Sequence, residues 1–179
     1  MVATGKHNRF GEIMKEKFRN KYRIDSARAS WWDYSTAGAY FITICTKYGT
    51  PHFGKIRNNK MHLSPCGVLA DEFWRQIPDH SKFAAIGCHV VMPNHVHGIL
   101  HVLEGSPPSP RREGDAMSEI SPQANSVSAI IRSYKSAVTR QAHRLGLDFA
   151  WQPRFYDHII RDDGEYERIA MYIANNVSA

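Results

Sequence analysis

Cysteine and long apolar runs are both scarce in this 179-residue sequence. Its three cysteines, Cys45, Cys66 and Cys88, lie far apart and form no CxxC pair, which predicts reduced structural thiols instead of a disulfide framework. No apolar stretch approaches the ~18 residues of a membrane-spanning helix, and residues 1–28 lack the apolar segment of a signal peptide. We therefore expect a cytoplasmic protein with no membrane partner.

Acidic residues are fewer than basic ones, since 17 Asp and Glu stand against 23 Lys and Arg for a formal net charge of +6. The basic excess is concentrated in residues 1–30 and returns between Arg132 and Arg161. Such a charge favours a polyanionic partner, usually nucleic acid, although a basic surface that serves only solubility gives the same composition. The length predicts one domain over residues 31–179, preceded by a basic arm over residues 1–30.

Apolar periodicity and turn signals predict short strands interleaved with helices. The expected strands are residues 39–46, a hairpin over 53–63 that turns at Asn58–Asn59, the pair 83–92 and 95–103, and 155–161. The expected helices run from Ser64 to Pro78, over 127–145, and onward from Asp163. Residues 104–126 combine Pro, Gly, Ser and charge, which is typical of a flexible loop. This order favours an α+β sandwich of ferredoxin-like or RRM-like type, with helices packed on a mainly antiparallel sheet.

Histidines alternate along the second strand of the tight pair. Because side chains alternate across a strand, His95, His97 and His101 point to one face, and the first two lie side by side. Two adjacent imidazoles are suited to one divalent ion or to a phosphate; the alternative is that they are polar residues on a solvated strand face. Histidine-triad nucleotide hydrolases require a histidine at the third alternate position, where this sequence has Ile99.

A metal held by two histidines needs further ligands, since a catalytic zinc ion usually takes three from the protein. The last expected helix carries Tyr172 and Asn176, which are four residues apart and therefore on one face, beside its apolar stripe. Asn176 is then a candidate amide ligand and Tyr172 a candidate nucleophile; the alternative is an interfacial tyrosine and a helix-end asparagine. Tyr134 lies within the apolar stripe of its own helix, which predicts core packing.

Four sequence blocks carry a family resemblance. They are VVMPNHVHGIL (90–100), SYKSAVTR (133–140), WQPRFYDHIIR (151–161) and YIANN (172–176). Together and in this order they resemble the REP-associated type of single-tyrosine HUH transposase, and residues 31–46 look like the opening strand of the same family. The resemblance extends from residue 31 to residue 176 and is interrupted by the loop over 104–126.

The resemblance implies an enzyme that cuts and rejoins single-stranded DNA, in particular hairpin-forming repeat DNA, through a 5′-phosphotyrosine. Carried onto this sequence, it implies His95, His97 and Asn176 as metal ligands and Tyr172 as the nucleophile. The phosphoryl chemistry favours Mg²⁺ or Mn²⁺ as the metal. The family usually continues with proline after the last ligand, whereas Val177 follows Asn176 here. The sequence does not identify the base that deprotonates Tyr172.

Three classes of function stay open at this point. They are the DNA strand transferase, a DNA-binding relative without catalytic activity, and a nucleotide phosphohydrolase that uses His95 and His97. The residues expected to contact the DNA backbone are Arg132, Lys135, Arg140, Arg154 and Arg161. The expected partner is single-stranded or hairpin DNA, bound by a nucleoid-associated monomer or homodimer.

Overall fold

The computed structural model describes residues 35–105 and 125–178. The predicted basic arm over residues 1–30 and most of the predicted loop over 104–126 lie outside the described residues.

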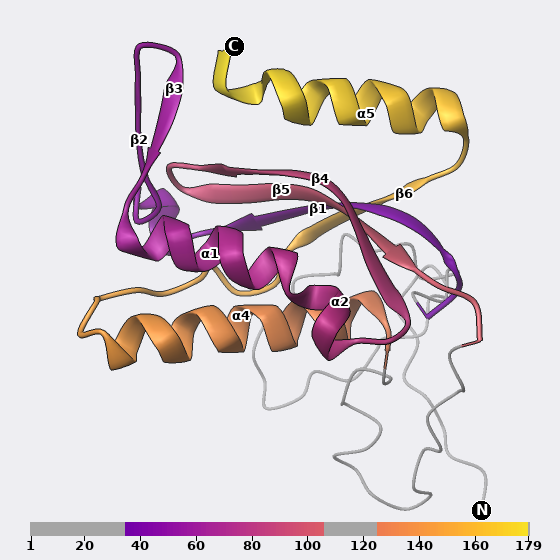
Figure 1. Cartoon of the computed structure of the whole chain (residues 1–179), viewed down its shortest axis with the longest axis horizontal. Helices are drawn as coiled ribbons and strands as arrows, with labels where there is room; N and C mark the ends of the chain where they lie inside the picture. The colour runs from indigo at the N-terminus through magenta and orange to yellow at the C-terminus, as the bar shows by residue number, and fades with distance from the viewer. Residues whose placement is uncertain (1–34, 106–124, 179) are drawn as a thin grey trace, which may run out of the picture. The chain divides into compact units, whose positions relative to one another are not determined.

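A four-stranded sheet forms the centre of the fold (Figure 1). Its strands are β1 (Gly38–Cys45), β4 (Ala84–Met92), β5 (His95–Val102) and β6 (Tyr156–Ile160). They lie in the order β4-β5-β1-β6, and each neighbouring pair is antiparallel. The chain passes from β1 to β4 through α1 (Pro65–Arg75) and from β5 to β6 through α4 (Val127–Arg144). The predicted α+β sandwich of ferredoxin-like type is therefore confirmed.

The two faces of the sheet are covered unequally. Helices α1 and α4 pack together on one face, and α5 (Asp163–Asn175) lies alone on the other (Figure 1). Alternate residues of β1, namely Tyr40, Ile42 and Ile44, are fully buried in the main core. The α5 face has a smaller apolar contact, which includes the buried side chains of Ile99 and Ile173. The larger core thus fixes the sheet and leaves the α5 face partly open.

Side-chain caps begin the three long helices at or next to the predicted positions. The hydroxyl of Ser64 accepts a hydrogen bond from the Gly67 amide, and the hydroxyl of Ser126 does the same for Ala129. The carboxylate of Asp162 accepts from the Glu165 amide and caps α5. Each cap satisfies a backbone donor that has no partner within the first helical turn.

The sequence predicted that Pro78 ends the first long helix, and this prediction was wrong. Helix α1 ends at Arg75, and a short helix, α2 (Ile77–His80), follows with Pro78 in its first turn. Proline suits that position because the N–H it lacks has no intrahelical partner there. The first long helix therefore ends two residues before Ile77, the last residue expected in it.

A separate two-stranded ribbon follows β1. It consists of β2 (Gly54–Arg57) and β3 (Lys60–Leu63), which are antiparallel. Asn58 and Asn59 connect the strands with φ angles of 51° and 55°. Two successive positive φ angles define the hairpin turn predicted from this dipeptide. Short 3₁₀ turns, η2 (Lys47–Gly49) and η3 (Asn176–Ser178), follow β1 and α5.

All three cysteines are free, and burial raises the pKa of each thiol. Within residues 35–105 and 125–178, no helix combines the length and apolar character needed to span a bilayer.

Gly98 lies on β5 where α1 packs against the sheet, so a substitution at this position tests that packing. A Cβ at this position would overlap the fully buried indole of Trp74. We expect Gly98→Ala to lower the free energy of unfolding by ~1–3 kcal/mol, because the buried indole has little room to move. Gly38→Ala at the exposed start of β1 is the matched control, since its nearest neighbouring atom is 3.8 Å away. Equal stability of the two variants in urea unfolding would contradict this packing.

Candidate active site

His95 and His97 lie side by side on the face of β5 that α5 covers. Their ring centroids are 4.4 Å apart, and the Phe41 ring stacks on His97 with a centroid distance of 5.2 Å. His97 is 8% exposed. Phe41 comes from β1, where it faces the same side of the sheet as the histidines. The two imidazoles are therefore held by the sheet and not by a loop.

Each imidazole is oriented through its Nδ1 atom. The Thr43 hydroxyl is 2.8 Å from Nδ1 of His97, and the Asn94 amide oxygen is 2.7 Å from Nδ1 of His95. The Asn94 amide nitrogen donates to the carbonyl of Gly49 at 3.2 Å, so its oxygen faces the ring. His95 must then donate from Nδ1, which leaves a lone pair on its Nε2.

The environment keeps both histidines neutral. Burial lowers the pKa of His95, and burial together with the neighbouring His95 lowers the pKa of His97 to about 4. Neutral imidazole is the form that binds a metal ion. The pair is therefore ready to act as ligands at neutral pH without first losing a proton.

Tyr172 reaches the same place from α5. Its hydroxyl is 3.4 Å from Nε2 of His97, which is a long hydrogen bond, and its ring makes an edge contact with Phe41. The side chain is 51% exposed. His95, His97 and Tyr172 thus form one cluster, the His–Tyr site, with its phenol open to a large substrate.

Asn176 lies one helical turn beyond Tyr172. Its backbone angles, φ −60° and ψ −33°, continue the helix, so the two residues share one face. In the part of the chain that the structure describes, its side chain makes no hydrogen bond to either histidine. The structure brings Asn176 to the edge of the His–Tyr site without showing a contact between them.

Two other tyrosines approach the sheet. Tyr134 is 3% exposed on the α1 and α4 side, where its hydroxyl donates to the Ala70 carbonyl at 2.9 Å and burial raises its pKa. The predicted core packing of Tyr134 is confirmed. Tyr166 lies on α5 with its hydroxyl 3.4 Å from Nε2 of His101, close against Gly87. Tyr172 is the most exposed of the three.

Lys135 directs its ammonium group into the protein. The Nζ atom donates to the carbonyl of Gln152 at 2.7 Å and to that of Arg154 at 2.9 Å. Burial lowers its pKa. These bonds tie α4 to the segment before β6, so the donors that were predicted to meet DNA are used within the fold.

The other predicted DNA-binding residues are exposed but are not gathered at the His–Tyr site. Arg132 and Arg140 lie on α4, on the opposite face of the sheet (Figure 1). Arg154 and Arg161 flank β6. Nothing in this arrangement tests their contact with DNA, which stays a prediction.

The side chains at the His–Tyr site limit which ligands a metal ion could have there. Within residues 35–105 and 125–178, no three His, Cys, Asp or Glu side chains cluster closely enough to hold an ion. A metal at the His–Tyr site would therefore bind two imidazoles and neutral oxygen donors. Asn176, an amide on the adjoining helix face, is of that kind.

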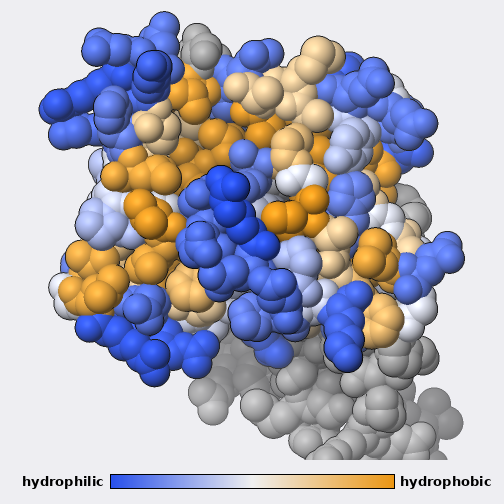
Figure 2. Space-filling model, in the orientation of Figure 1, coloured by the Kyte–Doolittle hydropathy of each residue, from blue (hydrophilic) through white to orange (hydrophobic). Residues whose placement is uncertain are grey.

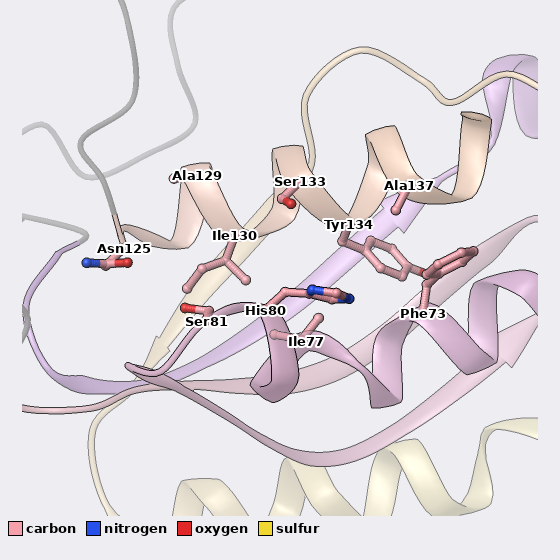
Figure 3. Close-up of a pocket in the computed structure, with 10 residues that line it drawn as sticks. All are labelled: Phe73, Ile77, His80, Ser81, Asn125, Ala129, Ile130, Ser133, Tyr134 and Ala137. Carbon is pink, nitrogen blue, oxygen red and sulfur yellow. The ribbon is translucent and has the colours of Figure 1, made fainter. Parts of the chain in front are cut away.

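A cavity of about 240 Å³ lies elsewhere, between α2 and α4 (Figure 3). Apolar side chains such as Ile77 and Ile130 line it, together with the polar side chains of His80 and Ser81. It is on the far side of the sheet from His97 and contains none of the predicted catalytic or metal-binding residues.

Two residues of the site were missed in the sequence. Asn94 immediately precedes His95, and a turn asparagine beside a ligand histidine is a usable local signal. Thr43 is 54 residues from His97, and only the register of β1 against β5 places them opposite each other. That register is not readable from local periodicity.

Comparisons with known proteins identify a solved structure with a similar fold and a relative similar in sequence. The fold is that of a solved REP-associated tyrosine transposase bound to a REP hairpin, with a TM-score of 0.54 and 21% identity over 86% of this chain and 72% of that one. No family model matches the sequence. An uncharacterized protein of Haemophilus influenzae (strain ATCC 51907 / DSM 11121 / KW20 / Rd) is 35% identical over 155 residues, 84% of this chain and 86% of the relative. The chain belongs to the same family as this Haemophilus protein.

Stability measurements distinguish the buried tyrosine from the site tyrosine. We expect Tyr134→Phe to lower the free energy of unfolding by ~1–2 kcal/mol, because the Ala70 carbonyl loses its buried donor. Tyr172→Phe should change it by less than ~0.5 kcal/mol, since that hydroxyl is exposed and its bond is long. Urea unfolding of both variants checks this, and a larger loss for Tyr172→Phe would show the assignments to be reversed.

Proposed function

We propose that this protein is a metal-dependent transposase that cleaves and rejoins single-stranded DNA. The observation that carries the proposal is the approach of an exposed phenol, Tyr172, to a pair of neutral, oriented imidazoles, His95 and His97. The shared fold adds support, because the solved neighbour is a tyrosine transposase bound to hairpin DNA. Hairpin DNA with a single-stranded extension is therefore the substrate we infer.

Imidazole ligands suit later transition ions, so it is the phosphoryl chemistry, and not the donor set, that favours Mg²⁺ or Mn²⁺ here. His95, His97 and Asn176 would hold Mg²⁺ or Mn²⁺ through two imidazole nitrogens and one amide oxygen, which leaves positions for phosphate oxygens. When bound, such an ion polarises the scissile phosphate and stabilises the charge that develops on it. The Nδ1 contacts of His97 with Thr43 and of His95 with Asn94 hold both rings in place.

Tyr172 is the nucleophile in this proposal. Its oxygen forms a bond to phosphorus while the bond from phosphorus to the 3′ oxygen breaks, which yields a 5′-phosphotyrosine and a free 3′-hydroxyl. The phenol loses one proton and the departing 3′ oxygen gains one. Because one phosphodiester replaces another, the reverse reaction joins strands without ATP.

The exposed arginines stay candidates for contacts to the DNA backbone. Arg154 and Arg161 flank β6 at an edge of the sheet, and Arg132 and Arg140 lie on α4 in the opposite layer. A strand that reached both groups would have to pass around the edge of the sheet. Lys135 would contribute only after breaking its two bonds to carbonyl oxygens.

Loss of the phenol gives the direct test of the chemistry. Incubation with labelled hairpin DNA and Mn²⁺ should give a covalent adduct on a denaturing gel, and peptide mapping should locate it at Tyr172. Tyr172→Phe should abolish the adduct, because within residues 35–105 and 125–178 the Tyr172 hydroxyl is the oxygen that lies beside His97 Nε2. Tyr48→Phe, at a tyrosine that is 89% exposed, is the matched control and should retain it. An adduct mapped to any other residue would falsify the assignment.

The Thr43 hydroxyl provides a test of metal binding. Thr43→Val keeps the shape of the side chain but removes the partner of His97 Nδ1, so we expect Mn²⁺ affinity to fall ~10–100-fold. Thr139→Val, which removes a hydroxyl bonded to a helix carbonyl in α4, is the matched control and should leave the affinity unchanged. Electron paramagnetic resonance of unbound Mn²⁺ measures both, and equal affinities would contradict the proposed role of His97.

A further inference from the structure

The ribbon formed by β2 and β3 has two chemically different faces. In the observed register Ile56 is opposite Met61, and both lie on one face. Lys55 is opposite His62 and Arg57 is opposite Lys60 on the other. We call Lys55, Arg57, Lys60 and His62 the basic face of the ribbon. All four are exposed, whereas Met61 packs against the main core.

The basic face does not stabilise the ribbon. Arg57 and Lys60 are directly opposite each other, and like charges at such positions are destabilising. Residues 47–70 contain no Asp or Glu. Among the described residues, no ion pair involves the basic face. Three exposed cations, Lys55, Arg57 and Lys60, without counter-charges are therefore a feature that folding does not require.

The base of the ribbon is fixed to the strand turn that leads into the His–Tyr site. The amide of Phe53 donates to the carbonyl of Pro93 at 2.9 Å, and the amide of Ser64 donates to the carbonyl of Phe53 at 2.9 Å. Phe53 is fully buried. Pro93 is two residues before His95, so the ribbon and the first histidine share one anchored segment.

The ribbon also adjoins the end of the helix that carries the nucleophile. Strand β3 lies beside η3, which begins at Asn176, and the ribbon projects beside the C-terminal end of α5 (Figure 1). In the space-filling view, hydrophilic side chains gather over the projecting ribbon (Figure 2). The ribbon that carries the basic face is thus held beside the end of α5 and the turn before His95, in contrast to the arginines of α4.

We propose that the basic face of the ribbon binds the phosphate backbone of duplex DNA adjoining the single strand at the His–Tyr site. This inference rests on the proposed function and adds a second DNA contact to it. Lysine and arginine neutralise phosphates, and a two-stranded ribbon has the width that a major groove admits. In a hairpin substrate the duplex is the stem, which the ribbon holds while the single-stranded extension lies at Tyr172.

The composition of the ribbon favours duplex over single-stranded DNA. Surfaces that bind single strands combine positive charge with aromatic side chains on which bases stack. Residues 54–63 contain no Phe, Tyr or Trp, and the ribbon therefore offers charge without a stacking platform. Its contact should be with phosphates and should depend strongly on salt.

The test compares two DNA molecules and two protein variants. Fluorescence anisotropy measures binding of a hairpin with a single-stranded extension, and of the extension alone, over a series of KCl concentrations. We expect Arg57→Gln/Lys60→Gln to lower the slope of log K against log[KCl] for the hairpin by about 2, which is ~0.9 for each lost phosphate contact. Binding of the extension alone should not change. The variant should fold at least as well as the parent, because it removes an unfavourable charge pair.

The matched control removes two charges elsewhere. Lys82 precedes β4 and Arg144 ends α4, and both are exposed. Lys82→Gln/Arg144→Gln should leave the hairpin slope unchanged. Equal slopes for the parent and the ribbon variant would overturn the inference, as would an equal loss of affinity for the hairpin and the extension. A loss that follows net charge alone, seen in both variants, would also overturn it.

Adduct formation separates this inference from the proposed function. With saturating single-stranded extension, the ribbon variant should form the Tyr172 adduct as the parent does. If the parent forms no adduct but the ribbon variant still loses hairpin affinity, the chemistry fails and the duplex contact stands. If adducts form and the hairpin slope is unaffected, the duplex contact fails and the chemistry stands.

Discussion

The docking of α5 on β5 is the constraint on which the site depends. The helix meets the strand at two tyrosine–histidine contacts, Tyr172 with His97 and Tyr166 with His101, each at 3.4 Å. The two tyrosines are ~9 Å apart along the helix and the two histidines ~13 Å apart along the strand. Both hydroxyl contacts are long, so they mark the rotation and translation of the helix, while the buried side chains of Ile99 and Ile173 contribute the apolar packing that holds it on the sheet. Gly87 permits the second, because a side chain there would displace the Tyr166 hydroxyl.

The unequal covering of the sheet explains how a rigid site stays accessible. The large core between the sheet and helices α1 and α4 holds β1 and β5 in register, which fixes Thr43 against His97. The opposite face is covered by one helix, and Tyr172 at its edge is half exposed. The face of the sheet that packs on α1 and α4 thus provides stability, and the face that carries α5 leaves the site accessible. A site within the main core would be equally well ordered but closed to a polymer.

Local patterns were sufficient to predict the elements and the histidine face, because strand alternation depends on a period of two alone. The ferredoxin-like order, the turn at Asn58–Asn59 and the burial of Tyr134 follow from equally local signals. The partner of His97 does not, since Thr43 is brought to it by the pairing of strands distant in sequence. Pro78 was misread because one residue type both ends helices and begins them.

The order of the basic residues along the sequence did not predict which of them lie together in the fold. Five basic residues between positions 132 and 161 were each expected to contact the DNA backbone. The fold places two of them on α4, on the face of the sheet opposite the His–Tyr site, and uses the ammonium of Lys135 to bind two carbonyl groups before β6. The ribbon contributes fewer charges, but they share one face beside the end of α5. A polyanion responds to charges within about one Debye length, roughly 8–10 Å at ordinary ionic strength. Position in the fold therefore determines which basic residues act together, and a net charge of +6 does not.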